Sequence, residues 1–326
     1  MCPERGNQAE IALGIQETSR VRFPLDRRSL SLPRTRRCDL TLTLLNFPTM
    51  GLAVTVGIVP VLYVAFLSLQ NLRLGSSAPM AFAGWSNYSF ILSDPSVANA
   101  FRNTLYFSFL SIVLATSAGL GIALLMNNDA VKVSKWLILG IVLPWAIPEI
   151  VNALVWQWIF NPTFGALNGL LVSLHLLRDY RAWLSTPSSA MHAVVFAYSW
   201  KLVPFVALVL YAALRSIPNE LYECAQLDGA TIWAQFRYIS WPLLTPAVAV
   251  VVLFTAVWSM RAFDIVYLLT SGGPGEATML LSYFTFTKAF QFGDLGASAA
   301  VACLLVAMTL IMTVIYWRML PREEPQ

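Results

Sequence analysis

Residues 220–244 read ELYECAQLDGATIWAQFRYISWPLL, a run of mixed charge and apolarity in a chain that is otherwise largely hydrophobic. Pro218 and Asn219 precede it and end the apolar run before it, since proline cannot continue a helix but suits the start of a new one. Glu220 and Glu223 then fall in the first turns of a short helix, where carboxylates complement the positive end of the helix dipole. This pattern predicts a short amphipathic helix between two apolar segments.

The dipeptide Asp228-Gly229 is expected to end that helix. Asp228 is also a candidate N-cap for a second helix, with Thr231 three residues further on. Pro242 then marks the entry to the next apolar run. The segment is therefore predicted to be a helix–glycine–helix element.

Apolar residues recur on the second helix at spacings of four and three, at Ile232, Phe236 and Ile239, which makes a stripe along one face. Such an element either lies as an interfacial helix pair on the lipid headgroups or inserts as a knob into a groove of a soluble partner. The residues of the segment leave both interpretations open.

The rest of the chain indicates a membrane protein. Of its 326 residues, 57% are hydrophobic and only 12% are charged, whereas about a quarter of the residues in soluble domains are charged. A helix needs roughly 20 mostly apolar residues to cross the hydrocarbon core. Six segments meet this requirement: 44–69, 101–126, 136–160, 189–214, 243–269 and 296–317.

The segment 136–160 is the least regular of the six, because polar residues and prolines interrupt it. Prolines are tolerated in membrane helices where neighbouring groups satisfy the freed backbone. Glu149 and Asn152 lie beside Pro144 and Pro148 near its middle. A pore wall and hydrogen bonding between helices explain this arrangement equally well.

Lysines and arginines predict the orientation, since cytoplasmic loops carry the excess. With both termini inside, the inside segments hold fourteen of these residues, eight of them in the N-terminal tail, and the outside loops hold five. Both termini and the segment 220–244 are therefore expected in the cytoplasm. The tail is not expected to be a cleavable signal peptide, because its polar part is too long.

Motifs of enzymes and of nucleotide binding do not occur. None of the four lysines follows a glycine, so the chain has no phosphate-binding P-loop, and neither histidine has a partner at zinc-ligand spacing. The glycine-rich run SGGPGEAT at 271–278 follows an apolar segment and predicts a tight external turn. We expect no catalytic site, no metal and no cofactor on this chain, and transport is the class to consider.

The segment 220–244 resembles the cytoplasmic signature of the membrane subunits of bacterial ABC importers, which reads E-A-A, three residues, G, nine residues, I, one residue, L-P. Every spacing agrees, from Glu223 through Gly229 and Ile239 to Pro242. Two positions depart from the signature, where Cys224 stands for the first alanine and Trp241 for the leucine, and both changes leave the coupling role little affected.

The resemblance extends over roughly residues 44–318. The stretches WSNYSFILSDP, RNTLYFS, LPWAIPEIVNALVWQWIFNPTFGALN and LLTSGGPGEAT look like the sugar-type permeases of the maltose and glycerol-3-phosphate importers. The SGGP stretch favours the half that resembles the larger maltose permease subunit. The resemblance implies an all-α fold, a six-transmembrane-helix type I ABC importer permease bundle with a cytoplasmic coupling helix.

That resemblance divides the chain into an Arg-rich cytoplasmic tail (1–43), the transmembrane domain (44–318) with its coupling loop (217–242), and a cytoplasmic C-terminal tail (319–326). It implies a second homologous permease subunit, two ATPase subunits that bind ATP and magnesium, and an external solute-binding protein, with no role for nucleic acid. The residues expected to couple to the ATPase are Glu223, Ala225, Asp228, Gly229, Ala230, Phe236, Ile239 and Pro242.

Charged residues within the apolar segments are candidates for the solute pathway. Lys201 precedes Arg215 by 14 residues, which is about 21 Å along a helix, so that it either has a snorkelling or structural role or faces a cavity. Arg261 and Asp264 are three apart, so they are expected to share a helix face and to pair.

The sugar-type permeases carry their sugar site on the fourth and fifth core helices. Matching the W-x-x-x-P stretch at 200–204 and the residues before LLT places several positions of this chain at that site, with Ser259 to bond a hydroxyl and Phe205 or Trp258 to stack on a sugar ring. The expected pathway residues are Lys201, Leu202, Phe205, Trp258, Ser259, Arg261, Ala262 and Asp264.

A lysine at the depth of Lys201 suggests an anionic solute, such as a glycerol phosphate, a uronate or a sulfonated sugar. The alternative class is a secondary solute transporter, which would need coupling-ion sites and usually has internal repeats. No convincing repeat relates the first three apolar segments to the last three, and the coupling loop would have no role in such a transporter.

Overall fold

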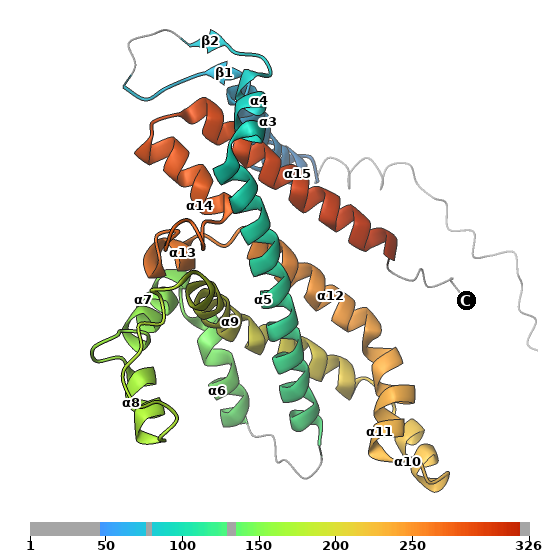
Figure 1. The fold of residues 1–326 in the computed structure, drawn as a ribbon. Coiled ribbons are helices and arrows are strands. Elements are labelled where there is room, and N and C mark those ends of the chain that lie inside the picture. Colours follow the sequence, from blue (N-terminus) through green and yellow to red (C-terminus); the bar gives the residue numbers. More distant parts are fainter. Residues whose placement is uncertain (1–45, 76–79, 129–134, 320–326) are drawn as a thin grey trace, which may run out of the picture. The chain divides into compact units, whose positions relative to one another are not determined.

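The computed structural model describes residues 46–75, 80–128 and 135–319 (Figure 1). The predicted N-terminal tail and residues 320–326 of the predicted C-terminal tail lie outside the described residues. The chain forms two compact units that divide between Val59 and Pro60.

Long apolar helices dominate the described chain and confirm the predicted all-α membrane fold. Among the described residues, five helices are long and apolar enough to cross a bilayer, and a bent helix pair makes the number of spans six if the pair is one span. The five are Asn46–Leu67, Pro95–Asn127, Pro187–Arg215, Ile232–Met260 and Leu295–Arg318. The first contains the π-helical turn η1 (Val54–Ile58) and α3 (Val59–Leu67), and the others include α5 (Pro95–Asn127), α9 (Pro187–Arg215) and α15 (Leu295–Met319).

The third predicted span, 136–160, is not one continuous helix. It consists of α6 (Lys135–Ala146) and α7 (Glu149–Ile159), whose axes differ in direction by 94°. Pro148 caps α7 in an extended conformation, with φ −56° and ψ 146°. A proline has no N–H to donate and disfavours the helical conformation in the residue before it, so the helix breaks at this point.

The fifth predicted span, 243–269, is wrong at both ends. Its helix already starts at Ile232 and passes through the π-helical turn η2 (Phe236–Ser240) into α12 (Trp241–Met260). Pro242 therefore sits inside a continuous helix, directly after a turn in which the Trp241 N–H donates to the carbonyl of Phe236. Such widened turns absorb local irregularities in a helix ladder. At the other end the helix stops at Met260, and α13 (Asp264–Leu269) follows as a separate element.

The core is centred on α5 and α9, which pack against each other and cross in Figure 1. The two helices approach closely at Gly119, since a Cβ atom there would lie 2.5 Å from Cγ1 of Val206. Phe107 of α5 and Leu210 of α9 are fully buried in the same cluster. Because bilayer lipid is as apolar as the helices, close packing at small residues is what holds such spans together.

Short elements gather at the end of the unit opposite α10 (Asn219–Leu227) and α11 (Ile232–Gln235) (Figure 1). Strands β1 (Gln70–Asn71) and β2 (Ala81–Phe82) pair antiparallel, with Gln70 opposite Phe82. The other short elements at this end are α4 (Ser86–Ser93), α14 (Leu281–Phe286) and the π-helical turn η3 (Thr287–Gln291), whereas α8 (Ala166–Ser173) packs against α7.

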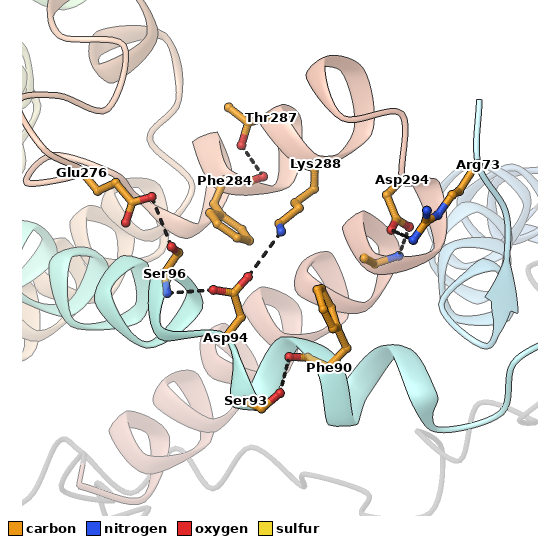
Figure 2. Close-up of polar contacts among 11 residues, drawn as sticks. Arg73, Phe90, Ser93, Asp94, Ser96, Glu276, Phe284, Thr287, Lys288 and Asp294 are labelled. Carbon is orange, nitrogen blue, oxygen red and sulfur yellow. Dashed lines mark hydrogen bonds and ion pairs between the residues drawn. The ribbon is translucent and has the colours of Figure 1, made fainter. Parts of the chain in front are cut away.

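Polar contacts fasten these short elements to the start of α5, as Figure 2 shows. Asp94 accepts a hydrogen bond from the backbone N–H of Ser96 as the N-cap of α5, and its second oxygen lies 3.3 Å from Nζ of Lys288 in η3. The Lys288 ammonium also lies 5.1 Å from the ring centre of Phe284, a cation–π distance. The ammonium of Lys288 and the carboxylate of Asp94 therefore neutralise each other within the fold.

The glycine-rich run 271–278 is the tight turn that its composition predicts. The carbonyl of Glu276 accepts hydrogen bonds from the amide groups of both Asn99 and Asn103, at 3.0 and 2.9 Å. Gly272 has φ +81°, a conformation that glycine adopts at little cost.

Candidate functional site

Two places in the described structure bring the sequence-predicted residues together: the coupling element (residues 217–242) and a cavity where the third and fifth spans break. Helix α10 of the coupling element ends in a Schellman turn, in which the N–H of Gly229 donates to Gln226 (3.0 Å) and the N–H of Ala230 to Ala225 (2.8 Å). Gly229 has φ +77°, and a Cβ atom there would meet nothing within 4 Å. The glycine is therefore required by the backbone conformation and not by a close neighbour.

The second helix is capped by Thr231, so the expectation that Asp228 caps it is wrong. The Thr231 hydroxyl accepts a hydrogen bond from the N–H of Ala234 at 3.3 Å. Asp228 instead closes α10, with φ −77° and ψ 1°. An N-cap residue needs an extended backbone, which Thr231 has and Asp228 does not.

Two hydrogen bonds tie α10 and the turn after it to the helix that follows. The hydroxyls of Tyr222 and Ser240 lie 3.0 Å apart, and the Gln235 amide donates to the carbonyl of Ala230 at 3.1 Å. Ser240 is buried, and Tyr222 packs against the core. The coupling element is thus joined to α12 by side chains as well as by the chain itself.

The tip of the coupling element exposes large apolar side chains. Leu227 is 89% exposed, Ile232 86% and Trp233 71%. The carboxylates of Glu220 and Glu223 are exposed on the same helix, α10. An isolated soluble surface rarely displays such a cluster, and apolar anchors surrounded by charge are typical of a docking site.

The predicted stripe of Ile232, Phe236 and Ile239 is confirmed only in part. Ile232 is exposed, but Phe236 is partly buried and lies beside Trp233 and Trp241 at ring distances of 5.7 and 6.1 Å. Ile239 packs against the core. The helix continues into the bundle, so its later apolar residues turn inward. Sequence reasoning missed Leu227 and Trp233, which flank the glycine turn and therefore lie at its tip.

The second site is a cavity of about 270 Å³ where both helix breaks meet. The break between α6 and α7 supplies Trp145 and Glu149, and the break between α12 and α13 supplies residues 261–265. Helix α9 closes the third side. The lining residues are Trp145, Glu149, Tyr198, Lys201, Leu202, Trp258, Arg261, Ala262, Phe263, Asp264 and Ile265.

Lys201 lines this cavity but does not present a free charge to it. Its Nζ lies 2.6 Å from Oε1 of Glu149, and the two side chains are 11% and 36% exposed. Lys201 therefore combines a structural ion pair with a place in the cavity wall, and it does not need to snorkel to the interface, because the carboxylate of Glu149 on α7 satisfies the ammonium in place. One turn along α7, the amide of Asn152 donates to the carbonyl of Ala197 at 3.1 Å. Of the two roles left open, Glu149 thus faces the cavity and Asn152 bonds another helix.

Arg261 and Asp264 do not form the predicted ion pair on a shared helix face. The helix ends between them, with Arg261 as the C-cap of α12 and Asp264 as the first residue of α13. The three-residue spacing brings side chains together only within a continuous helix. Neither residue takes part in the ion pairs found among the described residues, and both line the cavity.

Two other predicted pathway residues do not reach the cavity. Ser259 is fully buried, and its hydroxyl donates to the carbonyl of Ala256 at 3.0 Å. The Phe205 ring packs against Trp258 at 4.9 Å and Trp145 at 6.2 Å, so it supports the wall from behind. Trp145 and Tyr198 were missed, because nothing in their sequence neighbourhood shows which face they occupy.

Comparison with known proteins gives a consistent family. Residues 115–324 match the model of the binding-protein-dependent transport system inner membrane component. The chain is 35% identical to the trehalose/maltose transport system permease protein MalF of Thermococcus litoralis, over 84% of this chain and 91% of that protein. It is 32% identical to the sulfoquinovosyl glycerol transport system permease protein SmoG of Agrobacterium fabrum, over 90% and 96%.

Among solved structures, a bacterial alginate ABC transporter in complex with an alginate pentasaccharide-bound periplasmic protein contains a similar chain. The TM-score is 0.71 at 21% identity, with 86% of this chain and 93% of that chain covered. This likeness shows a shared fold.

Proposed function

The chain belongs to the family of binding-protein-dependent transport system inner membrane components. It is a permease subunit of a sugar ABC importer and not an enzyme, and we propose that its two sites have separate roles in transport. The coupling element receives movement from an ATPase subunit, and the cavity at the helix breaks forms part of the solute pathway. A second, homologous permease subunit completes the pore, and an external binding protein delivers the solute.

The shape of the coupling element carries this proposal. An apolar tip of Leu227, Ile232 and Trp233 on a rigid turn suits insertion into a cleft of a partner, with Glu223 on the adjoining helix to fix the register. The hydrogen bonds at Tyr222 and Gln235 would let the tip and α12 move together. Since α12 ends at the cavity, a displacement of the tip reaches the solute pathway through one helix.

A carbohydrate is the solute class that the cavity fits best. The Trp258 ring offers a face for a sugar ring, and Arg261 and Asp264 supply a donor and an acceptor for hydroxyl groups. The names of the relatives, trehalose/maltose and sulfoquinovosyl glycerol transport systems, support a sugar or a sugar-like solute.

For an anionic solute, Arg261 is a better candidate than Lys201. Lys201 is already satisfied by Glu149, whereas Arg261 lines the cavity outside any of the described ion pairs. Its guanidinium presents the planar pair of donors that carboxylate, sulfonate and phosphate groups accept. An acidic group of the solute would therefore bind at the α12–α13 break.

Co-purification tests the coupling proposal. With a tagged chain expressed beside its ATPase and second permease subunit, Glu223→Lys and Trp233→Ala are expected to release the ATPase while the two permease subunits stay together. Trp317→Ala is the matched control, since Trp317 is equally exposed but lies on α15. Retention of the ATPase by both coupling variants, with ATP-driven uptake intact, would exclude this docking mode.

A further inference from the structure

A second hollow, separate from the solute cavity, lies between α7, α8 and the outer part of α9. It has a volume of about 670 Å³ and is lined almost entirely by apolar side chains. Its lining residues are Trp156, Ile159, Phe160, Ala166, Leu167, Leu170, Arg181, Trp183, Ser189, His192, Ala193 and Phe196. We propose that this groove binds a phospholipid, with the phosphate at Arg181 and an acyl chain along the apolar wall.

The polarity of the groove changes along α9 in the way that an amphiphile requires. Ser189, His192 and Phe196 fall on one face of the helix, and the polar pair lies nearest its first turn. Phe196 is about 10 Å deeper than Ser189 at the rise of a helix. Trp156 packs edge-on against Phe196 there, with ring centres 5.3 Å apart. A headgroup at the shallow end and a tail at the deep end would match this gradient.

Arg181 is held at the groove by two neighbouring side chains, Asn168 and Trp183. Asn168, which is fully buried in α8, accepts hydrogen bonds from the N–H of Arg181 (3.2 Å) and the indole N–H of Trp183 (2.9 Å), and donates to the carbonyl of Arg181 (3.0 Å). The guanidinium carbon lies 5.4 Å from the centre of the Trp183 ring. Stacking on an aromatic ring leaves the edge donors of an arginine free for an anion.

Charge and composition favour a phospholipid over a sugar. A sugar carries a hydroxyl on nearly every carbon and needs polar partners around it, whereas apart from Arg181, Ser189 and His192 the residues that line this groove are apolar or aromatic. None of the described residues that line the groove is acidic, so the polar end suits a phosphate. Leu170 and Phe196 are half exposed along the groove, which gives an acyl chain lateral access from the bilayer.

Native mass spectrometry of the assembled importer tests this site. The complex is purified from nanodiscs that contain dioleoyl phosphatidylglycerol, and retained lipid is measured. Arg181→Ala is expected to lower retention about tenfold, since it removes a charge-assisted bond, whereas Arg178→Ala, an exposed arginine of the same loop outside the groove, leaves retention unchanged. Ala166→Trp, which fills the apolar part, is expected to lower retention while Arg181 stays in place.

Two further outcomes decide the matter. Excess glycerol phosphate is expected to leave the lipid bound, because the tail contributes to affinity, and displacement by glycerol phosphate alone would show a simple anion site instead. If the assembled wild-type complex retains no more lipid than the Arg181→Ala complex, the groove is covered by the second permease subunit and the proposal is wrong. Neither result depends on ATPase coupling, so the proposed function is tested separately.

Discussion

At the scale of single residues, the bond between Lys201 and Glu149 changes how the cavity is understood. A lysine deep in a span suggests a site for an anion, yet its ammonium lies 2.6 Å from a carboxylate on another helix. Removing one member of such a pair leaves the other charge unsatisfied in a partly buried site. Loss of transport in a single variant would therefore not identify Lys201 as a solute ligand.

We expect Lys201→Met to destabilise the protein by about 2 kcal/mol, between the values for exposed and fully buried pairs, and to reduce uptake. Lys201→Met combined with Glu149→Gln is expected to recover most of both losses, because no lone charge remains. Thermal unfolding in detergent and uptake into proteoliposomes measure the two effects.

The comparison variant is Arg261→Gln. Arg261 lines the cavity and takes part in none of the ion pairs among the described residues. If the solute carries an acidic group, this variant raises the apparent KM while leaving stability nearly unchanged. A double variant at 149 and 201 that stays as inactive as Lys201→Met would instead make Lys201 a direct solute contact.

At the scale of elements, the π-helical turn η2 and the Tyr222–Ser240 bond connect α10, α11 and α12. Ser240 is buried within the turn, and its hydroxyl lies 3.0 Å from that of Tyr222 on α10. A hydrogen bond in such a place stabilises by about 1 kcal/mol and costs more when one partner is removed. Under the proposed coupling role, this bond fixes the angle between α10, which would dock on the ATPase, and α12, which it would move.

Tyr222→Phe is expected to retain the ATPase and to hydrolyse ATP, but to move less solute for each ATP, because the tip can swing without α12. Parallel measurement of ATP hydrolysis and solute uptake in proteoliposomes gives this ratio. Tyr238→Phe is the control, since Tyr238 lies on the same element with its side chain exposed. An unchanged ratio in both Tyr222→Phe and the Tyr222→Phe/Ser240→Ala double variant would remove the bond from the coupling path.

At the scale of the whole molecule, the predicted orientation places the coupling element and the cluster around Lys288 on opposite sides of the membrane. Among the described residues, five long helices and one bent pair that counts as a single span would give six spans, and an even number agrees with the prediction that both termini lie on one side. The excess of lysine and arginine in the predicted inside segments predicts that this side is the cytoplasm.

Cys224 reports this orientation directly, because it is a free, exposed thiol on α10. In a chain with Cys2, Cys38 and Cys303 changed to serine, a membrane-impermeant maleimide is expected to label Cys224 in inverted vesicles and not in intact cells. Co-expression of the ATPase is expected to reduce the labelling of inverted vesicles. Labelling of Cys224 in intact cells would show that the topology is the reverse of the predicted one.

The local sequence determined where most of the long apolar helices of this protein lie. Apolar runs predicted the six spans, and the break at Gly229 was predictable because a left-handed backbone favours glycine whatever surrounds it. Pro148 likewise marked an irregular place in the third span. These features depend on preferences that reach only a few residues along the chain.

Tertiary packing alone decided the rest. The partner of Lys201 lies 52 positions away in the sequence, the inward turn of Ile239 follows from the continuation of its helix into the bundle, and Arg261 and Asp264 separate because α12 stops between them. The type of a side chain shows that a charge within a membrane needs a compensating group. Which residue supplies that group depends on how helices distant in the sequence pack, and this packing is fixed only when the chain folds.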